Sequence, residues 1–368
     1  MRSEEGESLS SKDGDRSSGD VKLTVVVGTF NGARTLGMAL DALESQVTEF
    51  TYEVIVVNDA STDETAEIAA RPRVRLINLE TNCGHGHTLN VGLAEARGEF
   101  MAMMDDDCVP PSQWIQQLGV AWGSVDSSVT MIGGLVEPYE TDTFNRRYVA
   151  FRRPLRHQEA QLSEDVGFWP RLRYQFFPPN MRPDPRPVFF TVGANMSVRV
   201  SAAREAGGFS ERRGAGEEES LARPLRAQYG PLTVQLFPSI VMYHNFQPSL
   251  WDTFRRSRSY GRGSGREWVS DRDIPSIAPL IPCAAVVAGA VALASPLSGL
   301  VVLVLSPYIL YRRWFTWRRE GRPREAVLYP YIQAGEDIAN NAGFVQGAWH
   351  EYRSRRRRGR QVSREASD

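Results

Sequence analysis

The run Phe100-Met101-Ala102-Met103-Met104-Asp105-Asp106-Asp107 is the most telling part of this 368-residue chain. Its five apolar residues predict a buried strand, and the three aspartates follow at the carboxyl end of that strand. In an open parallel sheet, ligands bind in the crevice beyond the carboxyl ends of the strands. Adjacent carboxylates repel each other, and a divalent cation held by oxygen ligands would compensate them and bind substrate phosphates. A solvated acidic turn is the alternative interpretation.

Three further strand-like runs precede this one, and helix-like segments separate them. The strand-like runs are Leu23–Val27, Glu53–Val57 and Val74–Ile77. Apolar residues at helical spacing occur in Thr35–Gln46, and a loop followed by a helix is expected over residues 84–96. Strands that alternate with helices predict an α/β fold with a parallel sheet. The polar loops that follow these strands would then converge with the aspartates on one edge of the sheet.

Several short polar motifs accompany the strands in a definite order. They are Val26–Asn31, Val56–Asp63, Asn82–Gly84, Asn90–Gly92, Arg97–Glu99, the triple aspartate, Gly193–Ser197 and Gly207–Phe209. In this order and spacing, residues 21–263 resemble the inverting glycosyltransferases of family 2. The resemblance implies the GT-A fold, which is Rossmann-like and has a mostly parallel central sheet flanked by helices.

The resemblance also implies a nucleotide-diphosphate-sugar donor, linked to UDP, GDP or dTDP, and Mg²⁺ or Mn²⁺ as the cofactor. Asp105 and Asp107 would be the outer members of the DxD motif, with Asp107 on the metal. Asp59 would bond the base or ribose, and a turn-forming or capping role is its alternative. His244 would join the metal or the diphosphate, with a purely structural role as its alternative. The residues expected to bind the nucleotide sugar are Thr29, Phe30, Asn31, Asp59, Asn82, Gly84, Asn90, Asp105 and Asp106.

The candidate catalytic base lies in Gly216-Glu217-Glu218-Glu219-Ser220-Leu221. Family members commonly carry Gly-Glu-Asp-x-Asp-Leu, in which the aspartate of Glu-Asp deprotonates the acceptor hydroxyl. Glu218 matches that position with glutamate for aspartate, and Ser220 replaces the last acid. Because the carboxylate of a glutamate lies one methylene further out, Glu217 competes with Glu218 for the role. A charged first turn of a helix is the alternative interpretation of the segment.

A second prominent feature is the uncharged stretch from Ile274 to Tyr311. One membrane-spanning helix needs about 20 residues, so the stretch is too long for one span and barely long enough for two. Ser295-Pro296 interrupts it, which predicts a transmembrane helical hairpin, with a buried hairpin or a re-entrant, half-inserted pair as alternatives. Arginine-rich flanks, 312–324 and 353–360, predict that both ends of the hairpin lie on the cytoplasmic side.

The chain divides into six expected segments. They are a disordered acidic tail (1–20), the GT-A domain (21–245), an amphipathic, basic connector (246–273), the transmembrane hairpin (274–311), an interfacial amphipathic helix (312–352) and a basic disordered tail (353–368). Connector arginines in 255–263 would cover phosphates or face lipid headgroups. Residues 142–188, rich in arginine, proline and aromatic residues, would build the acceptor side or a covering loop. The three cysteines, Cys83, Cys108 and Cys283, show neither metal nor disulfide spacing.

These features predict a membrane-associated family 2 glycosyltransferase of the hexosyltransferase type (EC 2.4). It would move a sugar, with inversion, to a hydroxyl or phosphate acceptor, lipid-linked or on a glycan, at the cytoplasmic face of the membrane. The net charge of −1 gives no indication of nucleic-acid binding. No Gln-x-x-Arg-Trp motif precedes the uncharged stretch, which weighs against a processive polymerase. The alternative is a catalytically inactive nucleotide-sugar-binding or membrane scaffold protein, because Glu218 and Ser220 depart from the family pattern.

Overall fold

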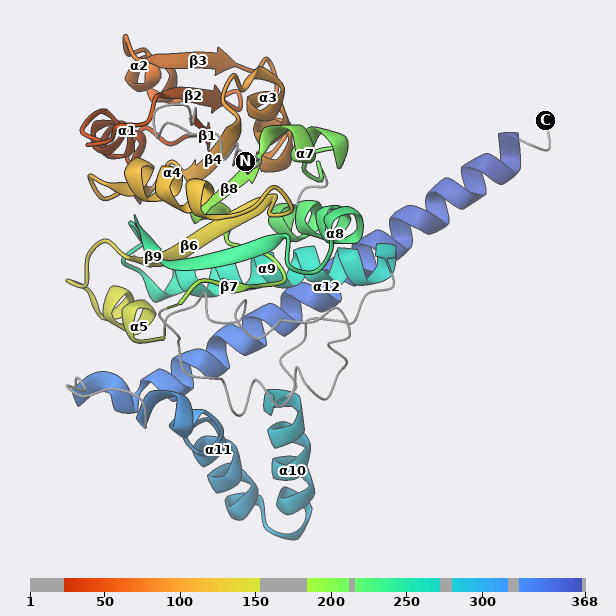
Figure 1. Ribbon diagram of the computed structural model, residues 1–368. Coiled ribbons are helices and arrows are strands. Elements are labelled where there is room, and N and C mark those ends of the chain that lie inside the picture. Colours follow the sequence, from red (N-terminus) through yellow and green to blue (C-terminus); the bar gives the residue numbers. More distant parts are fainter. Residues whose placement is uncertain (1–22, 153–183, 212–215, 272–279, 317–323, 366–368) are drawn as a thin grey trace, which may run out of the picture.

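The computed structural model describes residues 23–152, 184–211, 216–271, 280–316 and 324–365. A central sheet carries helices on both faces, and a helical hairpin and a long C-terminal helix lie beneath it in the view of Figure 1. The predicted disordered tail, 1–20, and most of the arginine- and aromatic-rich region, 142–188, fall outside the described residues.

One half of the sheet is parallel and comes from the first part of the chain. Its strands lie in the order β3-β2-β1-β4 and run in the same direction. They are β1 (Leu23–Thr29), β2 (Tyr52–Asn58), β3 (Val74–Asn78) and β4 (Phe100–Asp105). All seven residues of β1 are buried, because β1 lies between two strands and is covered on both faces. The alternation of strands and helices predicted this half correctly.

The other half of the sheet is mixed, which corrects the expectation of a mostly parallel sheet. Strand β8 (Met196–Arg199) pairs antiparallel with β4 and with β6 (Met131–Pro138), and β9 (Val234–His244) runs parallel to β6. Two short strands, β5 (Cys108–Val109) and β7 (Arg186–Pro187), pair antiparallel with β9. A buried strand has the same apolar pattern in either direction, so the pattern alone did not reveal the reversals.

Helices cover both faces of the sheet, and each layer forms a hydrophobic core with it. On one face residues of α1, α2 and α4 share a core with Val25 and Val27, and on the other residues of α3, α7 and α8 share a core with Val26. This division follows from strand geometry, because successive side chains point to opposite faces. The helices are α1 (Leu36–Glu44), α2 (Thr65–Ala69), α3 (His85–Glu95), α4 (Trp114–Ser124), α7 (Val200–Glu205) and α8 (Glu217–Tyr229).

Helix α9 (Leu250–Asp271) and helix α12 (Tyr329–Glu365) lie side by side beneath the sheet (Figure 1). Glycines allow their backbones to approach closely. A Cβ atom on Gly261 would lie 2.0 Å from the carbonyl oxygen of Asn340, and one on Gly343 would lie 2.0 Å from the carbonyl oxygen of Arg258. Neither position therefore has room for a side chain.

A polar cluster attaches α12 to α5 (Phe144–Arg152) and to α9. The Tyr148 hydroxyl donates to Glu336 Oε2 at 2.5 Å, and the Ser257 hydroxyl donates to Glu336 Oε1 at 3.1 Å. Glu336 is buried, and such bonds offset part of the cost of removing a carboxylate from water. The first half of α12, which follows the short η3 turn (Arg324–Val327), is thus held against the folded domain.

Helices α10 (Leu280–Ala294) and α11 (Pro296–Thr316) form a hairpin that projects away from the sheet (Figure 1). Its turn lies at the Ser295-Pro296 break expected from the sequence. Of the helices that the structure describes, none combines the length and the apolar character needed to cross a membrane, so a transmembrane hairpin is not supported. Helix α10 has 15 residues where a span needs about 20, and α11 runs on through Arg312 and Arg313.

Helix α12 continues to Glu365, although the sequence predicts a disordered tail from residue 353. Two contacts extend the helix beyond that point. The Arg355 guanidinium pairs with Glu351 one turn earlier at 3.2 Å, and it donates to the carbonyl oxygen of Ser270 at 3.0 Å. An ion pair at this spacing favours a helix, and the bond to α9 is a tertiary contact that charge composition does not reveal.

Candidate functional site

The candidate site lies at the carboxyl ends of β1, β2 and β4. Strand β1 has β2 on one side and β4 on the other, so the strand order reverses at this point. The register places Thr29 opposite Asn58 and Gly28 opposite Asp105, which brings the loops after these strands together as predicted. A pocket of about 320 Å³ opens there, and it is lined by Gly28, Phe30, His85, Asp105, Asp106, Asp107, His244, Arg256 and Tyr260.

Two carboxylates and an imidazole form the centre of this pocket. His244 Nε2 lies 3.3 Å from Asp107 Oδ1 and 3.9 Å from Asp105 Oδ2. Burial and the neighbouring Asp105 carboxylate raise the pKa of Asp107 to about 8. Burial and the charge of Arg256 lower the pKa of His244 well below its usual value. The imidazole is therefore neutral at pH 7 and can offer a lone pair to a metal.

The donor atoms at this centre fit a divalent cation. Asp105, Asp107, Cys108 and His244 each offer one ligand atom, and these atoms all lie within 4.8 Å of one another. His244 is 5% exposed, and its Nδ1 atom has no hydrogen-bond partner among the described residues. A cation would favour the ionised form of Asp107 and so counter the desolvation of that carboxylate. The structure brings together the two residues predicted as metal ligands, Asp107 and His244, and their ligand role stays a prediction.

Asp106 points towards the loop after β1. The Thr29 hydroxyl donates to Asp106 Oδ2 at 2.5 Å, and a Cβ atom on Gly32 would lie 2.2 Å from the same oxygen. Burial raises the pKa of Asp106, and the bond from Thr29 partly offsets that rise. The middle aspartate thus ties the loop after β1 to the loop after β4. Asp106 lines the pocket and Thr29 does not.

Asp59 shapes the loop that carries Asn82 and Gly84. Its Oδ1 accepts a hydrogen bond from the Cys83 N–H at 2.7 Å, and its Oδ2 accepts one from the Gly84 N–H at 2.8 Å. The Asn82 amide donates to the Asp59 carbonyl oxygen at 3.3 Å. Gly84 has φ 98°, a conformation that favours glycine. These bonds match the turn-forming alternative for Asp59, and its contact with a base or ribose stays a prediction.

Two predicted asparagines also hold loops in place. Asn31 has φ 55°, and its Oδ1 accepts a hydrogen bond from the Thr62 N–H at 2.9 Å. The Asn90 amide donates to the carbonyl of Phe209 at 2.9 Å and accepts from its N–H at 2.8 Å. Phe30, in contrast, is 49% exposed and faces the pocket. Of the residues predicted to bind the nucleotide sugar, those that line the pocket are Phe30, Asp105 and Asp106.

The two candidate bases open helix α8. Glu218 Oε1 accepts a hydrogen bond from the Gly193 N–H at 2.9 Å, on the η2 turn (Gly193–Asn195) before β8. Burial raises the pKa of Glu218, and burial together with the charge of Glu218 raises the pKa of Glu217 to about 7. Neither glutamate lines the pocket. The Asp105 carboxylate contributes to both raised pKa values, so the pair lies within electrostatic range of the acid cluster.

Ser220, which replaces the last acid of the family pattern, holds the start of α8. Its hydroxyl donates to the carbonyl oxygen of Glu217 at 2.6 Å and accepts a hydrogen bond from the Ser210 N–H at 3.1 Å. The serine thereby connects the first turn of α8 to the segment after α7. The departure from the pattern has a structural role and leaves both glutamates in place.

Four residues of the pocket were not predicted individually: Gly28, His85, Arg256 and Tyr260. Arg256 and Tyr260 are four residues apart on α9 and therefore share one face of that helix. Arg255 is the neighbouring arginine, and its side chain is 67% exposed. The sequence marked the arginines of 255–263 as phosphate or headgroup ligands. Helical spacing could have shown that Arg256, and not Arg255, lies on the same helix face as Tyr260. For His85, the only indication in the sequence was its place after Gly84.

Two models of known protein families match this chain. A family model described as glycosyl transferase family 2 matches residues 24–207, half of the chain. This chain belongs to that family. A second model, described as glycosyl transferase family group 2, matches residues 180–317, the part that contains α8 to α11.

Curated relatives align with parts of this family 2 chain. The succinoglycan biosynthesis protein ExoO of Rhizobium meliloti (strain 1021) is 41% identical over 95 residues, which are 25% of this chain and 27% of that protein. The dolichyl-phosphate beta-glucosyltransferase ALG5C of Trichomonas vaginalis (strain ATCC PRA-98 / G3) is 39% identical over 100 residues, 24% of this chain and 30% of that protein. The chain therefore spans less than a third of the length of these two relatives.

Among solved structures, the mannosyltransferase PcManGT from Pyrobaculum calidifontis, in complex with GDP-Man and Mn²⁺, is similar to this chain with a TM-score of 0.53. The two are 20% identical, and the match covers 86% of each chain. The likeness shows a shared fold. This family 2 member has a GT-A-like α/β fold, in which a mixed sheet is flanked by helices.

Proposed function

We propose that this protein transfers a sugar, with inversion, from a nucleoside diphosphate sugar to a hydroxyl or phosphate oxygen of an acceptor. The observation that carries this proposal is the convergence of three features in one pocket: the Asp105–Asp107–His244 cluster, the exposed ring of Phe30 and the guanidinium of Arg256. A cation and an arginine suit a diphosphate, and an exposed aromatic ring suits a base. The solved relative that binds GDP-Man and Mn²⁺ supports a nucleotide-sugar donor.

The metal in this proposal is Mg²⁺ or Mn²⁺, held by Asp105, Asp107 and His244. When bound, it supplies positive charge that neutralises the diphosphate and stabilises the departing nucleoside diphosphate. The guanidinium of Arg256 adds a positive charge to the lining of the same pocket. Asp59 bonds to the adjacent loop, which contains Asn82 and Gly84 and would receive the base and ribose.

Glu218 is the proposed base for a hydroxyl acceptor, and Glu217 is its competitor. The hydrogen bond from the Gly193 N–H orients the Glu218 carboxylate. A raised pKa makes that carboxylate a better proton acceptor near neutral pH. The acceptor oxygen gives its proton to Glu218 while it bonds to the anomeric carbon. The bond from that carbon to the diphosphate oxygen breaks on the opposite side, so the configuration inverts through an oxocarbenium-like transition state.

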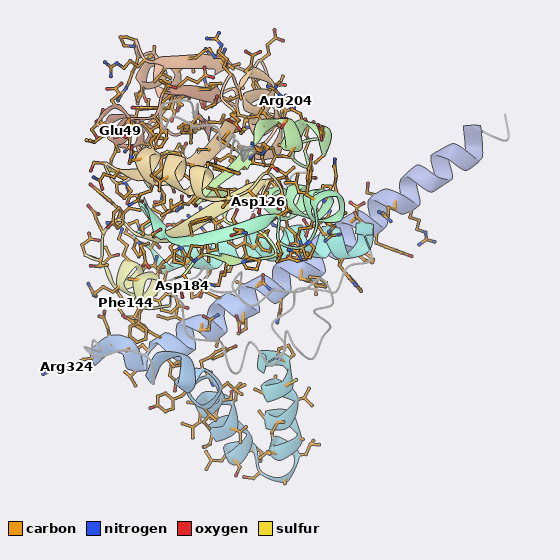
Figure 2. The ribbon with its side chains drawn as sticks, viewed as in Figure 1. Glu49, Asp126, Phe144, Asp184, Arg204 and Arg324 are labelled. Atoms are coloured by element: carbon orange, nitrogen blue, oxygen red, sulfur yellow. The ribbon has the colours of Figure 1, made fainter. Side chains whose placement is uncertain are left out.

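We further propose that the enzyme works at the cytoplasmic face of a membrane on a lipid-linked acceptor. The α10–α11 hairpin exposes apolar side chains, and Leu293 beside its turn is 92% exposed. In Figure 2 the hairpin side chains are drawn mostly as carbon. Exposed apolar surface of this extent marks an interaction site. With α10 shorter than a membrane span, the hairpin would enter the interface and return. The dolichyl-phosphate glucosyltransferase relative supports a lipid acceptor.

Nucleotide release tests the reaction. The full-length protein is incubated with Mn²⁺, a panel of UDP-, GDP- and dTDP-sugars, and polyprenyl-phosphate or glycolipid acceptors in vesicles. We expect one donor to give acceptor-dependent release that stops in EDTA, with a product of inverted anomeric configuration by NMR. Nucleotide binding without release from any donor and acceptor pair would favour the inactive binding protein.

Vesicle flotation tests the membrane site separately. The full-length protein should float with vesicles, whereas Leu293→Ser combined with Leu297→Ser should reduce flotation and leave nucleotide binding intact. Glu49→Gln, an exposed change on the far side of the domain, serves as the matched control. A C-terminal reporter should read cytoplasmic in cells, and an external reading would overturn the proposed orientation.

A further inference from the structure

The acid cluster contains a thiol that the proposed reaction does not use. Cys108 is fully buried, and its sulfur lies within 4.8 Å of the ligand atoms of Asp105, Asp107 and His244. Strand register explains this position. Cys108 on β5 is paired directly with His244 on β9, and directly opposed residues of an antiparallel pair project from the same face.

The imidazole provides a second and independent indication of a metal ligand set. His244 is almost completely buried, with its Nε2 directed at Asp107 and Asp105 and its Nδ1 lacking a hydrogen-bond partner among the described residues. Its ring stacks on Phe246, with ring centres 4.2 Å apart and planes 15° from parallel. The stacking keeps Nε2 directed at the acids, so packing, and not a hydrogen bond to Nδ1, sets the orientation of the ring.

The four side chains belong to two classes of ligand. Carboxylate oxygens suit Mg²⁺ and Mn²⁺, whereas thiolate and imidazole suit Zn²⁺ and Cd²⁺. A catalytic metal keeps a coordination position open for substrate. A metal held by four protein ligands has no such open position. Among divalent first-row metals, Co²⁺ also binds a given protein site more tightly than Mn²⁺. Zn²⁺ binds tetrahedral sets of sulfur, nitrogen and oxygen ligands, which is the composition found here.

We propose that this centre has two modes of metal occupancy that differ in the use of Cys108. In the open mode, Asp105, Asp107 and His244 hold Mg²⁺ or Mn²⁺ and leave positions for the donor diphosphate. In the closed mode, the incoming Zn²⁺ or Cd²⁺ displaces the thiol proton of Cys108, which passes to water, and the sulfur completes a four-ligand site. The closed mode blocks the diphosphate, so thiophilic metals inhibit the enzyme. The inhibition rests on the proposed function, but the sulfur ligation does not.

Cobalt spectroscopy tests the ligation without any assay of activity. Co²⁺ is added to the metal-free full-length protein, and the thiolate-to-cobalt absorption in the near ultraviolet is followed. We expect one equivalent to give this absorption in the wild type and in Cys283→Ser, whose cysteine is exposed on α10. Cys108→Ser should lose it. Absorption that persists in Cys108→Ser, or Co²⁺ binding to the wild type without the absorption, would overturn the proposal.

Cadmium NMR of the wild-type protein keeps the test independent of how well Cys108→Ser folds. The chemical shift of the bound Cd²⁺ should indicate one sulfur ligand. A shift typical of oxygen and nitrogen ligands alone would contradict the closed mode. Zinc inhibition gives the functional result. Relative to each protein's own activity with Mn²⁺, the inhibition constant for Zn²⁺ should be at least about tenfold higher in Cys108→Ser than in Cys283→Ser. Absence of Mn²⁺-dependent nucleotide binding in all three proteins would instead count against the proposed function.

Discussion

The donor side of the pocket and its helical side are held in place by different interactions. On the donor side, the register of β1 with β2 and β4 fixes Thr29 and Asp105 through backbone hydrogen bonds. On the helical side, Arg256 and Tyr260 stand on α9, which lies against α12 by close backbone approach at glycines. A strand register is discrete, since a slip of one residue moves every side chain to the other face. The α9–α12 pair is positioned instead by contacts between glycines and the backbone of the opposite helix.

This difference separates the expected effects of substitutions. On the donor side, a change in a side chain removes chemistry and leaves the backbone in place. On the helical side, a change far from the pocket, such as one in α12, displaces the residues that line it. The two sides should therefore differ in whether activity and stability change together.

The largest effect is expected for Asp107→Asn on the donor side. It removes a proposed metal ligand and should lower kcat/KM by about 10⁴-fold, which corresponds to several kcal/mol of charge stabilisation. The melting temperature should not fall, because burial of the carboxylate already opposes its charge. Asp41→Asn on the exposed face of α1 is the control. Full activity of Asp107→Asn, or of the wild type in excess chelator, would refute the metal role.

Glu218→Gln should follow with a loss of about 10³-fold in transfer to a hydroxyl acceptor, because the amide keeps the shape of the side chain and cannot accept a proton. Donor binding, measured by calorimetry with Mn²⁺ and the nucleotide sugar, should stay unchanged. Glu217→Gln is the matched comparison. If Glu217→Gln is inactive while Glu218→Gln retains activity, the base is one residue earlier than proposed.

On the helical side, Gly343→Leu should lower the free energy of unfolding by about 2 kcal/mol, because its Cβ atom would lie against the backbone of α9. It should also weaken nucleotide binding, since α9 carries Arg256. Gly123→Ala in α4, where no atom lies within 4 Å of the added carbon, should be neutral or slightly stabilising. Urea denaturation measures both. Equal stability of Gly343→Leu and the wild type would show that α9 and α12 are not closely apposed in solution.

Arg256→Met should raise the dissociation constant for the nucleoside diphosphate about tenfold, which corresponds to about 1.4 kcal/mol, with little change in stability. The reason is the loss of one positive charge from the pocket. Arg255→Met, the exposed neighbour, should leave the constant unchanged. Equal effects of the two substitutions would show that Arg256 contributes no more than Arg255 to binding of the nucleoside diphosphate.

Over a single pH unit, the pH profile should show an effect no larger than that of Arg256→Met. The pKa of Glu217 is raised to about 7 and that of Glu218 is also raised, mainly by burial. A base with a raised pKa is protonated and inactive below that pKa and is available above it. We therefore expect kcat/KM with a hydroxyl acceptor to fall about tenfold per pH unit below the raised pKa of the base and to level off above it. A flat profile from pH 5 to 8 would contradict a carboxylate base with a raised pKa.

The sequence allowed the donor side to be predicted because its signals are local. The alternation of strands and helices predicted β1 to β4, and the acids stand directly at the end of β4. The role of His244 came from the family resemblance, and strand pairing brings it beside Asp107. The reversed direction of β8 could not be predicted, because an apolar pattern does not specify a pairing partner.

The helical side could not be predicted for a related reason. Gly261 and Gly265 fall in a segment that the sequence analysis treated as a basic connector, whereas the structure uses them as contact points between helices. Which arginine of that segment enters the pocket depends on the rotation of α9 about its axis, and α12 sets that rotation from about eighty residues further along the chain. Cys108 shows no metal-ligand spacing in the sequence, because His244 is distant along the chain and lies opposite it only in the β5–β9 pair.

The four glycines between α9 and α12 also limit how this protein can evolve. Added carbons at Gly261, Gly265, Gly343 and Gly347 would each meet a backbone carbonyl oxygen of the opposite helix, at 2.0 to 2.1 Å. A clash with a side chain can be relieved by a smaller residue opposite, but a clash with a backbone cannot. Compensatory pairs are therefore not accessible at these positions, and each glycine is constrained on its own for as long as the two helices stay together.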